Sequence, residues 1–332
     1  MLSKLLSYMD YDVFNGDADG ICALHQLRLA EPREAQLVSG VKRDINLLRK
    51  LARLPDLSNS RITVLDISMD KNRDDLQILL SKGNHIFYVD HHYPGDIPDK
   101  KNLKTIIDPD ANVCTGLLID EMLTGRYYLW AIVAAFGDNL HEAALKRIKK
   151  SNLMENQLAI LRETGELLNY NGYGRMISDL HYPPEDLYRE VSLYEDPFEF
   201  YNKSEVLTNL KKGVNSDLDR ARATVALSEN DTGRIFSFPN ASWARRVSGV
   251  FGNEKARQDP KKGHAVLVDN GDGSYLVSVR APLADKRGAA DLCRQFPTGG
   301  GREAAAGINN LPAASLDEFI DQFHRMWQGI KN

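Results

Sequence analysis

Residues that can bind metal ions or carry protons stand directly after short apolar runs in the first third of the chain. Asp17 and Asp19 follow one run, Asp66 ends a second, and the segment from Asp90 to His92 follows a third. Carboxylates with one or two imidazoles suit Mn²⁺ or Mg²⁺ better than structural zinc. Two such ions about 3.5 to 4 Å apart can clamp a phosphoryl oxygen and activate water. These residue types therefore predict phosphoester hydrolysis, with manganese as the preferred metal.

Each of these segments also has an ordinary structural explanation. Asp17 to Gly20 fits a plain turn, because Asp and Gly are common in turns. Asp66 fits a cap of the following helix, and the adjacent His91 and His92 fit a polar surface loop. The functional interpretation is favoured because all three segments follow apolar runs, which would bring their side chains to one edge of a sheet.

The elements that must position these residues alternate between short strands and helices from Tyr11 to about Asp110. This alternation predicts an α/β domain with a mostly parallel sheet, in which ligands gather beyond the carboxyl ends of the strands. The chain from 115 to 168 is predicted to be mainly helical. We expect strands at 11–14, 35–41, 61–67, 85–89 and 103–107, and helices at 21–30, 44–54 and 76–82.

The period of the hydrophobic pattern changes after Arg234, which predicts a second, smaller α/β domain. We expect residues 1–200 to form the catalytic metal-binding domain, 201–233 a helical linker and 234–332 a substrate-binding domain. The active site is expected in the cleft between the two domains. The expected elements of the second part are a helix at 207–227, strands at 235–238, 263–269 and 274–281, and a helix at 289–296.

Composition narrows the function classes. A formal net charge of −4 does not suggest a protein that coats long nucleic acid. Cys22, Cys114 and Cys293 are widely spaced, which fits reduced thiols better than disulfides or a zinc ribbon. The sequence shows neither a secretory signal nor an apolar run of about 18 residues, so we expect a soluble, cytoplasmic protein with no membrane partner.

Four segments, in their order and spacing, resemble the motifs of the DHH phosphoesterases. Asn15 to Gly20 resembles the first motif and Val64 to Ser68 the second. Asp90 to His92 resembles the third, and Gly137 to Asn139 the fourth. The resemblance implies a catalytic domain with a parallel sheet and a centre of two Mn²⁺ ions, with Mg²⁺ as the alternative metal.

The resemblance also implies roles for individual residues. Asp17 and Asp66 would bind the first ion, and Asp66 would bridge to the second. Asn15 stands where many members have histidine or aspartate, and its neutral amide should weaken the first metal position. The second ion would be bound by Asp19, Asp66, His91 and Asp138.

Two further residues are the expected catalytic groups beside the metal ligands. By the resemblance, His92 would face the substrate phosphate. Asp90 would support the histidines from behind, as metal-bound imidazoles generally require.

The segment from Gly299 to Gly307 resembles the glycine-rich signature of the DHH-associated C-terminal domain, so the resemblance covers nearly the whole chain. Backbone amides and a following helix start are expected to hold an anionic group, and Arg302, in place of the usual histidine, would add a charged fork. The alternative for the glycine run is an ordinary flexible loop. Arg280 is expected to contact substrate, and the alternative is a surface arginine on an edge strand. The expected substrate contacts are His92, Arg280, Gly299, Gly300, Gly301 and Arg302.

The expected substrate follows from this C-terminal domain, which resembles that of the nucleotide-cleaving branch of the family. With no basic excess to follow a long strand, we expect short oligonucleotides or linear or cyclic dinucleotides, and no long double-stranded nucleic acid. The alternatives are a RecJ-like 5′ exonuclease on single-stranded DNA, an exopolyphosphatase, and a non-catalytic nucleotide-binding regulator. The departures at Asn15 and Arg302 motivate the last of these. A homodimer remains open.

Overall fold

The computed structural model describes residues 9–148 and 153–328. The chain divides into two compact units between Lys212 and Gly213. This boundary falls inside helix α10 (Glu205–Arg222). The predicted limits at 200 and 234, and a cleft between the domains, stay predictions. Within the described ranges, none of the helices combines the length and the apolar character that a membrane crossing requires.

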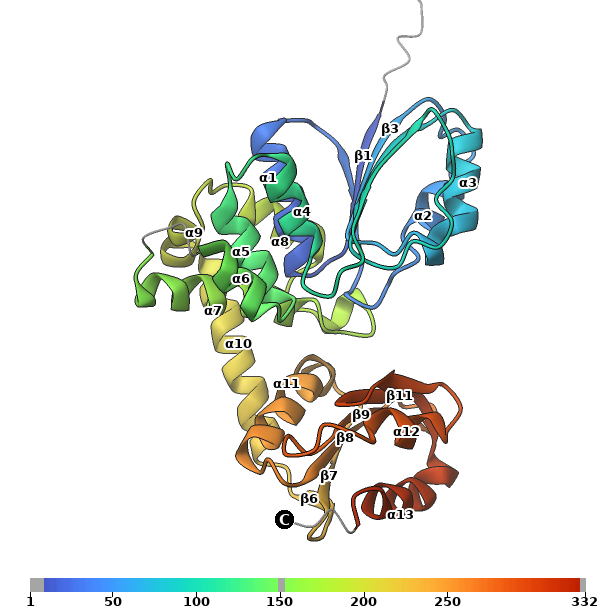
Figure 1. The fold of residues 1–332 in the computed structure, drawn as a ribbon, viewed down its shortest axis with the longest axis vertical. Coiled ribbons are helices and arrows are strands. Elements are labelled where there is room, and N and C mark those ends of the chain that lie inside the picture. Colours follow the sequence, from blue (N-terminus) through green and yellow to red (C-terminus); the bar gives the residue numbers. More distant parts are fainter. Residues whose placement is uncertain (1–8, 149–152, 329–332) are drawn as a thin grey trace, which may run out of the picture. The chain divides into compact units, whose positions relative to one another are not determined.

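A five-stranded parallel sheet organises the first unit, with the strand order β2-β1-β3-β4-β5. Figure 1 shows α1 (Ala18–Ala30) and α4 (Thr115–Met122) on one face of this sheet, and α2 (Leu48–Ala52) and α3 (Arg73–Ser81) on the other. Helices on both faces bury the strands, as parallel sheets require. The strands are β1 (Asp10–Phe14), β2 (Gln36–Val38), β3 (Arg61–Leu65), β4 (His85–Asp90) and β5 (Leu103–Ile107).

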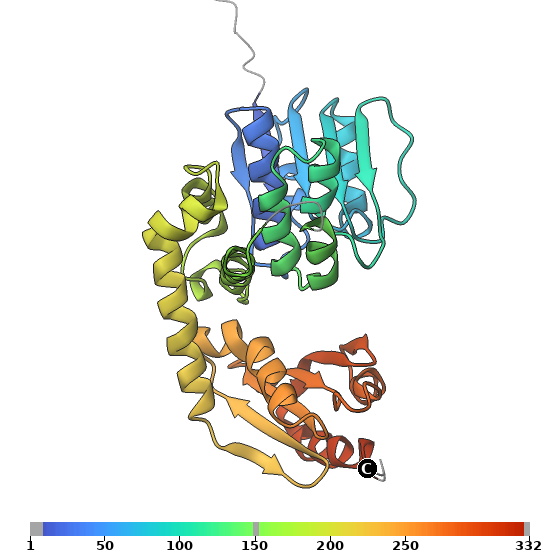
Figure 2. The same cartoon turned by 60° about the vertical axis from the view of Figure 1, so that its left-hand side comes forward.

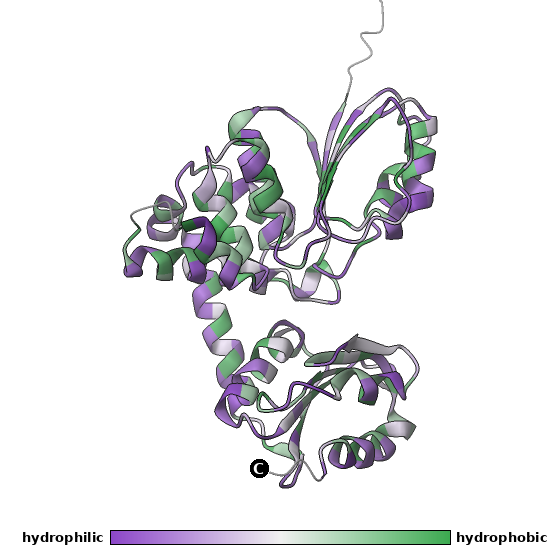
Figure 3. Ribbon diagram, in the orientation of Figure 1, coloured by the Kyte–Doolittle hydropathy of each residue, from purple (hydrophilic) through white to green (hydrophobic). Residues whose placement is uncertain are grey.

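The helices α2 and α3 close one half of this core with leucine side chains. Leu48 and Leu51 of α2 and Leu76 and Leu79 of α3 are at most 2% exposed and belong to one cluster with the strands. Figure 3 shows hydrophilic and hydrophobic residues together along α3, as expected for a helix with one buried face.

A bundle of helices continues the first unit behind α1. Its central helix, α5 (Tyr128–Gly137), is buried from Trp130 to Gly137 and packs against α1 and α7 (Glu155–Asn171). A Cβ atom on Gly137 would clash with Ala18, so this helix end approaches the start of α1 closely. The remaining helices of the unit are α6 (His141–Ile148), α8 (Pro184–Val191) and α9 (Pro197–Lys203), with 3₁₀ turns at Asp70–Asn72 and Ile177–Asp179.

The second unit contains a six-stranded mixed sheet with the order β10-β11-β9-β8-β7-β6. Only β7 and β8 pair in parallel among its described strands, and Figure 2 shows β6 and β7 as a light orange hairpin. The strands are β6 (Ala226–Glu229), β7 (Gly233–Phe238), β8 (Gly263–Asp269), β9 (Ser274–Arg280), β10 (Gly299–Arg302) and β11 (Ala305–Pro312). The helices are α11 (Ser242–Gln258), α12 (Ala289–Arg294) and α13 (Leu316–Met326), with a 3₁₀ turn at Ala313–Ser315.

The predicted fold class is confirmed: a parallel α/β sheet is followed by a smaller α/β unit. Two predictions about elements are wrong. The helix expected at 207–227 ends at Arg222, and β6 starts at Ala226, because the chain there pairs with β7. The glycine run does not lead into a helix, because Gly299–Arg302 pairs with β11, which itself pairs with β9.

Candidate metal centre

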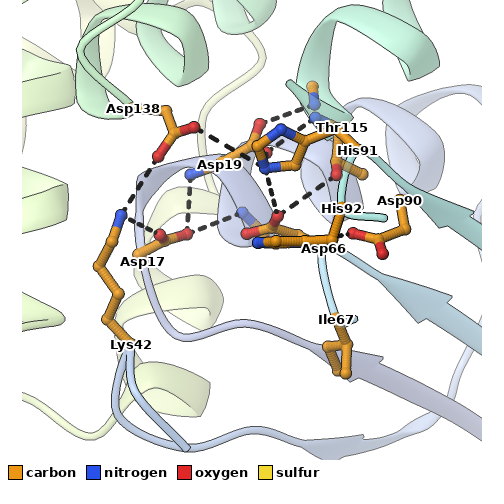
Figure 4. Close-up of polar contacts among 12 residues, drawn as sticks. Asp17, Asp19, Lys42, Asp66, Ile67, Asp90, His91, His92, Thr115 and Asp138 are labelled. Atoms are coloured by element: carbon orange, nitrogen blue, oxygen red, sulfur yellow. Dashed lines mark hydrogen bonds and ion pairs between the residues drawn. The ribbon is translucent and has the colours of Figure 1, made fainter. Parts of the chain in front are cut away.

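The acidic residues of the first unit gather where the sheet changes direction. In the strand order 2-1-3-4-5, the connections from β1 and β3 lead to opposite faces, and ligands bind at such a switch point. Asp17 and Asp19 follow β1, Asp66 follows β3 and His91 follows β4, while Asp138 ends α5. Figure 4 shows these side chains directed toward one another, so the structure brings the sequence-predicted ligands together.

Asp66 lies near the middle of this group in an unusual backbone conformation. Its φ is +59°, a left-handed value that few residues other than glycine adopt, and its N–H donates to the carbonyl of Val89 at 3.1 Å. Strained conformations of this kind concentrate at functional sites. Its Oδ1 atom lies 3.3 Å from Nε2 of His91 and accepts a hydrogen bond of 3.4 Å from the Thr115 hydroxyl.

Three carboxylates surround the Nε2 atom of His91. The nearest oxygens of Asp66, Asp138 and Asp19 lie at 3.3, 3.8 and 4.0 Å. Burial of His91 opposes its protonation, but the hydrogen bond to Asp66 and the three negative charges outweigh it and raise the pKa of His91 to about 10. When the imidazole gives up its proton, Nε2 becomes a possible metal ligand with three carboxylate oxygens within 4.0 Å of it.

Asp19 is held in this group by the start of helix α4. Its Oδ2 accepts the N–H of Thr115 at 2.8 Å, and its Oδ1 accepts the N–H of Gly116 at 2.7 Å. These N–H groups have no partner inside the helix, so the carboxylate satisfies them. Each carboxylate oxygen retains a further lone pair that a metal ion can use.

The close approach of these carboxylates favours binding of a cation. Burial, and the charges of Asp19 and Asp17, raise the pKa of Asp66 well above its usual range, although His91 acts in the opposite direction. Burial likewise raises the pKa of Asp138. Buried carboxylates that repel one another bind either protons or metal ions. The donors around His91 therefore fit a divalent ion.

His92 and Asp90 form a pair beside this centre. Nδ1 of His92 lies 2.7 Å from Oδ1 of the fully buried Asp90. A carboxylate at Nδ1 leaves Nε2 of the same ring free for another partner. Candidate ligand atoms of Asp66, His91 and His92 all lie within 4.8 Å of one another. Asp90, which was expected to support both histidines, thus contacts His92.

Asn15 is buried at the end of the first strand. Its backbone N–H donates to the carbonyl of Leu65 at 3.2 Å. Among the residues that the structure describes, its Oδ1 atom has no hydrogen-bond partner. Buried polar atoms are usually paired, so this oxygen is a candidate ligand for a cation.

Lys42 is a site residue that the sequence interpretation missed. Its Nζ lies 2.6 Å from Oδ2 of Asp17 and 3.3 Å from Oδ1 of Asp138. Burial works against the charge of Lys42, but Asp17, Tyr173 and Asp138 raise its pKa well above the usual value. Its position four residues beyond β2, at the same sheet edge as the acids, is the signal that could have identified it.

The expected substrate contacts other than His92 belong to the second unit. Arg280 ties β9 to α11, because its Nε donates to Oδ1 of Asn253 at 2.5 Å. Arg302 is exposed at the end of β10. A side chain at Gly299 would clash with a carbonyl of α12, whereas a Cβ at Gly300 would meet nothing within 4 Å. Gly299 is therefore required by the packing against α12, whereas the backbone at Gly300 is open to a ligand.

Comparison with protein families and curated proteins finds no matching family model and no matching curated protein. Solved structures do match. Exonuclease RecJ bound to manganese superposes with a TM-score of 0.62 at 15% identity, over 97% of this chain and 91% of that chain. RecJ from Thermus thermophilus in complex with Mn²⁺ gives 0.62 at 16% identity, over 98% of this chain but 52% of that one.

A third solved structure matches along its full length. PggH from Vibrio cholerae, a pGpG-specific phosphodiesterase, gives a TM-score of 0.57 at 10% identity, over 97% of this chain and 100% of that chain. The chain therefore has the two-domain fold of RecJ and PggH, which belong to the DHH superfamily. The resemblance expected from the four motifs is confirmed at the level of the fold.

Proposed function

We propose that this protein is a metal-dependent phosphoesterase that hydrolyses short oligonucleotides or linear or cyclic dinucleotides. One observation carries the proposal: carboxylates of Asp66, Asp138 and Asp19 converge within 4.0 Å of Nε2 of His91. The convergence lies at the switch point of a parallel sheet, where such folds bind ligands. The segments that resemble phosphoesterase motifs contain these same residues.

The metal ligands in this proposal are Asp19, Asp66, His91 and Asp138. When bound there, a divalent ion would polarise a phosphoryl oxygen and lower the pKa of a water molecule. Manganese is the first candidate and magnesium the second, because the set combines hard oxygen donors with one imidazole. Both RecJ structures that match the fold contain manganese, which supports this choice.

His92 is proposed to contact the phosphate group of the substrate. Asp90 holds Nδ1 of His92, which leaves Nε2 of the same ring available to face a phosphate oxygen. In this role Asp90 positions His92, and His92 meets the substrate.

The second unit is proposed to bind the rest of the substrate. Arg302 offers an exposed guanidinium beside the open backbone at Gly300, a combination that suits a phosphate or a terminal nucleotide. Arg280, Gly299 and Gly301 would complete this surface. Arg280 would have to exchange its contact with Asn253 for one with substrate.

Dinucleotides lead the proposed substrates because the fold matches a pGpG-specific phosphodiesterase over that protein's full length. The second candidate is a single-strand exonuclease, because RecJ gives the higher TM-score. The net charge of −4 supports the shorter substrates.

A substrate panel tests the proposed function. The full chain is incubated with Mn²⁺ and, separately, pGpG, pApA, cyclic dinucleotides, pAp, polyphosphate and 5′-labelled single-stranded DNA. We expect kcat/KM for dinucleotides to exceed that for single-stranded DNA by about tenfold or more, a difference of ~1.4 kcal/mol in transition-state stabilisation. A preference for single-stranded DNA would support the RecJ-like alternative. Absence of cleavage with every substrate, in Mn²⁺ and in Mg²⁺, would refute the proposal.

A further inference from the structure

The ammonium group of Lys42 lies among oxygen atoms, as a bound cation would. Its three acceptors are Oδ2 of Asp17 at 2.6 Å, Oδ1 of Asn169 at 2.9 Å and Oδ1 of Asp138 at 3.3 Å. A lysine ammonium has three N–H donors, so each donor has a partner. Figure 4 shows the side chain extending toward Asp17 and Asp138.

The end of helix α7 holds this lysine in place. The backbone N–H of Lys42 donates to the carbonyl of Gly172 at 2.9 Å, which anchors the residue across the unit. The amide nitrogen of Asn169 donates to the hydroxyl of Tyr173 at 3.0 Å, which directs its oxygen toward Lys42. Nζ also lies 5.8 Å from the centre of the Tyr173 ring, within range of a cation–π contact. The lysine position is thus built by several residues.

Both carboxylate oxygens of Asp17 accept hydrogen bonds from groups of this chain. Its Oδ1 accepts the N–H groups of Asp19 and Gly20, both at 3.1 Å, and thereby caps helix α1. Its Oδ2 accepts from Lys42. Burial would raise the pKa of Asp17, but Lys42 and the Gly20 N–H lower it overall. An ion at the first expected position would have to displace the lysine.

Asp138 connects the lysine to the centre around His91. Its Oδ1 faces Lys42, while its Oδ2 lies 3.8 Å from Nε2 of His91. One carboxylate therefore contacts Lys42 with one oxygen and faces His91 with the other, as a carboxylate that bridges two metal ions does. The expected first metal position does not fit the residues present, because Lys42 already contacts its principal carboxylate.

We propose that Lys42 takes the place of the first metal ion, so that the centre binds a single divalent ion through Asp19, Asp66, His91 and Asp138. This inference rests on the proposed function and revises the expectation of two ions. The identity of Asn15 agrees with it, because a neutral amide contributes no negative charge to offset a divalent ion at the first position. Lys42 would then present a fixed positive charge at the edge of the site.

Metal stoichiometry tests this inference on the full chain. Metal-free protein is titrated with Mn²⁺ by calorimetry, and bound manganese is counted after dialysis. We expect one ion per chain and the electron paramagnetic resonance spectrum of an isolated ion. Lys42→Met keeps the length of the side chain but removes the ammonium, so Asp17 becomes available. We expect that variant to bind two ions with an exchange-coupled spectrum.

Lys50→Met is the matched control. Lys50 lies in α2, where it donates to the carbonyl of Ser39 at 2.6 Å and pairs with Asp44 instead of with the site carboxylates. We expect this control to bind one ion. Two ions in the unsubstituted protein would overturn the inference but leave the proposed function standing. If neither the unsubstituted protein nor Lys42→Met binds a second ion, the role given to Lys42 is overturned. No bound metal at all would overturn the proposed function as well.

Discussion

The Nε2 atom of His91 lies 3.3 Å from Oδ1 of Asp66, although the two residues follow different strands. Leu65 and Val89 are register partners on the adjacent parallel strands β3 and β4, so the chain segments that follow them emerge together. The left-handed conformation of Asp66 belongs to this arrangement. Strand register therefore brings an acid and an imidazole into one ligand set.

Replacing Asp66 with asparagine should remove the metal centre. Asp66→Asn keeps the size of the side chain but removes a charge that offsets the ion. We expect Mn²⁺ affinity to fall by about a hundredfold, ~2.7 kcal/mol, and cleavage to fall to background. Calorimetric titration and the substrate assay measure both. Asp74→Asn, at an exposed position on α3, is the control. An Asp66→Asn variant with normal Mn²⁺ affinity would contradict the ligand assignment.

Replacing Asp90 should impair catalysis and spare the metal. Asp90→Asn removes the carboxylate that holds His92, so we expect kcat/KM to fall by about 10- to 100-fold. The Mn²⁺ dissociation constant should change little, because among the described residues the Asp90 side chain pairs with His92 and with none of the four proposed ligands. The double variant with His92→Ala should be no slower than His92→Ala alone. Additive losses would show that Asp90 acts by another route.

Two neighbouring glycines separate a structural role from a binding role. Gly301 has φ +140°, and a Cβ there would lie 2.5 Å from Cα of Ala306, so Gly301→Ala should destabilise the second unit by about 1–3 kcal/mol. Gly300 has open space, so Gly300→Ala should change stability by less than about 0.5 kcal/mol. If substrate approaches the backbone there, Gly300→Ala should raise KM. Thermal unfolding and kinetics measure the two effects, and an unchanged KM would argue against the proposed contact.

His264 should make the second unit sensitive to acid. It is completely buried, and burial is the main cause that lowers its pKa to about 4 from an ordinary value of 6.5. Below pH 6.5 the unfolded chain therefore binds a proton that the folded chain does not, so stability falls as pH falls from 6.5 toward 4. This group should cost about 1 kcal/mol between pH 7.5 and 5.5.

The measurement for His264 is urea unfolding at both pH values, followed by tryptophan fluorescence. His264→Leu should lose correspondingly less free energy of unfolding than the unsubstituted protein over this interval. Equal losses in the two proteins would show that His264 does not titrate as its burial requires.

Much of the site was predictable because parallel strands align their carboxyl ends at one edge. Asp66 and His91 each follow a strand directly and Asp17 comes shortly after β1, so the pattern of strands places them together. Lys42 and Asn169 were not predictable by this argument. They meet only because α7 packs so that Gly172 accepts the backbone N–H of Lys42, which is a long-range contact without a local signal.

The fold was predictable from the sequence where hydrophobic runs were clear, and the prediction failed where such runs were absent. Every expected strand of the first sheet is present, because each carries apolar residues that are buried or, in β5, partly buried against the core. The segment from Gly299 to Gly307 has little strand propensity of its own. It becomes two strands because β9 offers a partner, and propensity alone cannot show this.

The most direct test of the account is an anomalous diffraction map at the manganese absorption edge, from crystals of the protein grown with Mn²⁺. The account predicts one peak within coordination distance of Asp19, Asp66, His91 and Asp138, with Lys42 still contacting Asp17. A map with no peak among these four residues, or with manganese bound elsewhere in the chain, would contradict it.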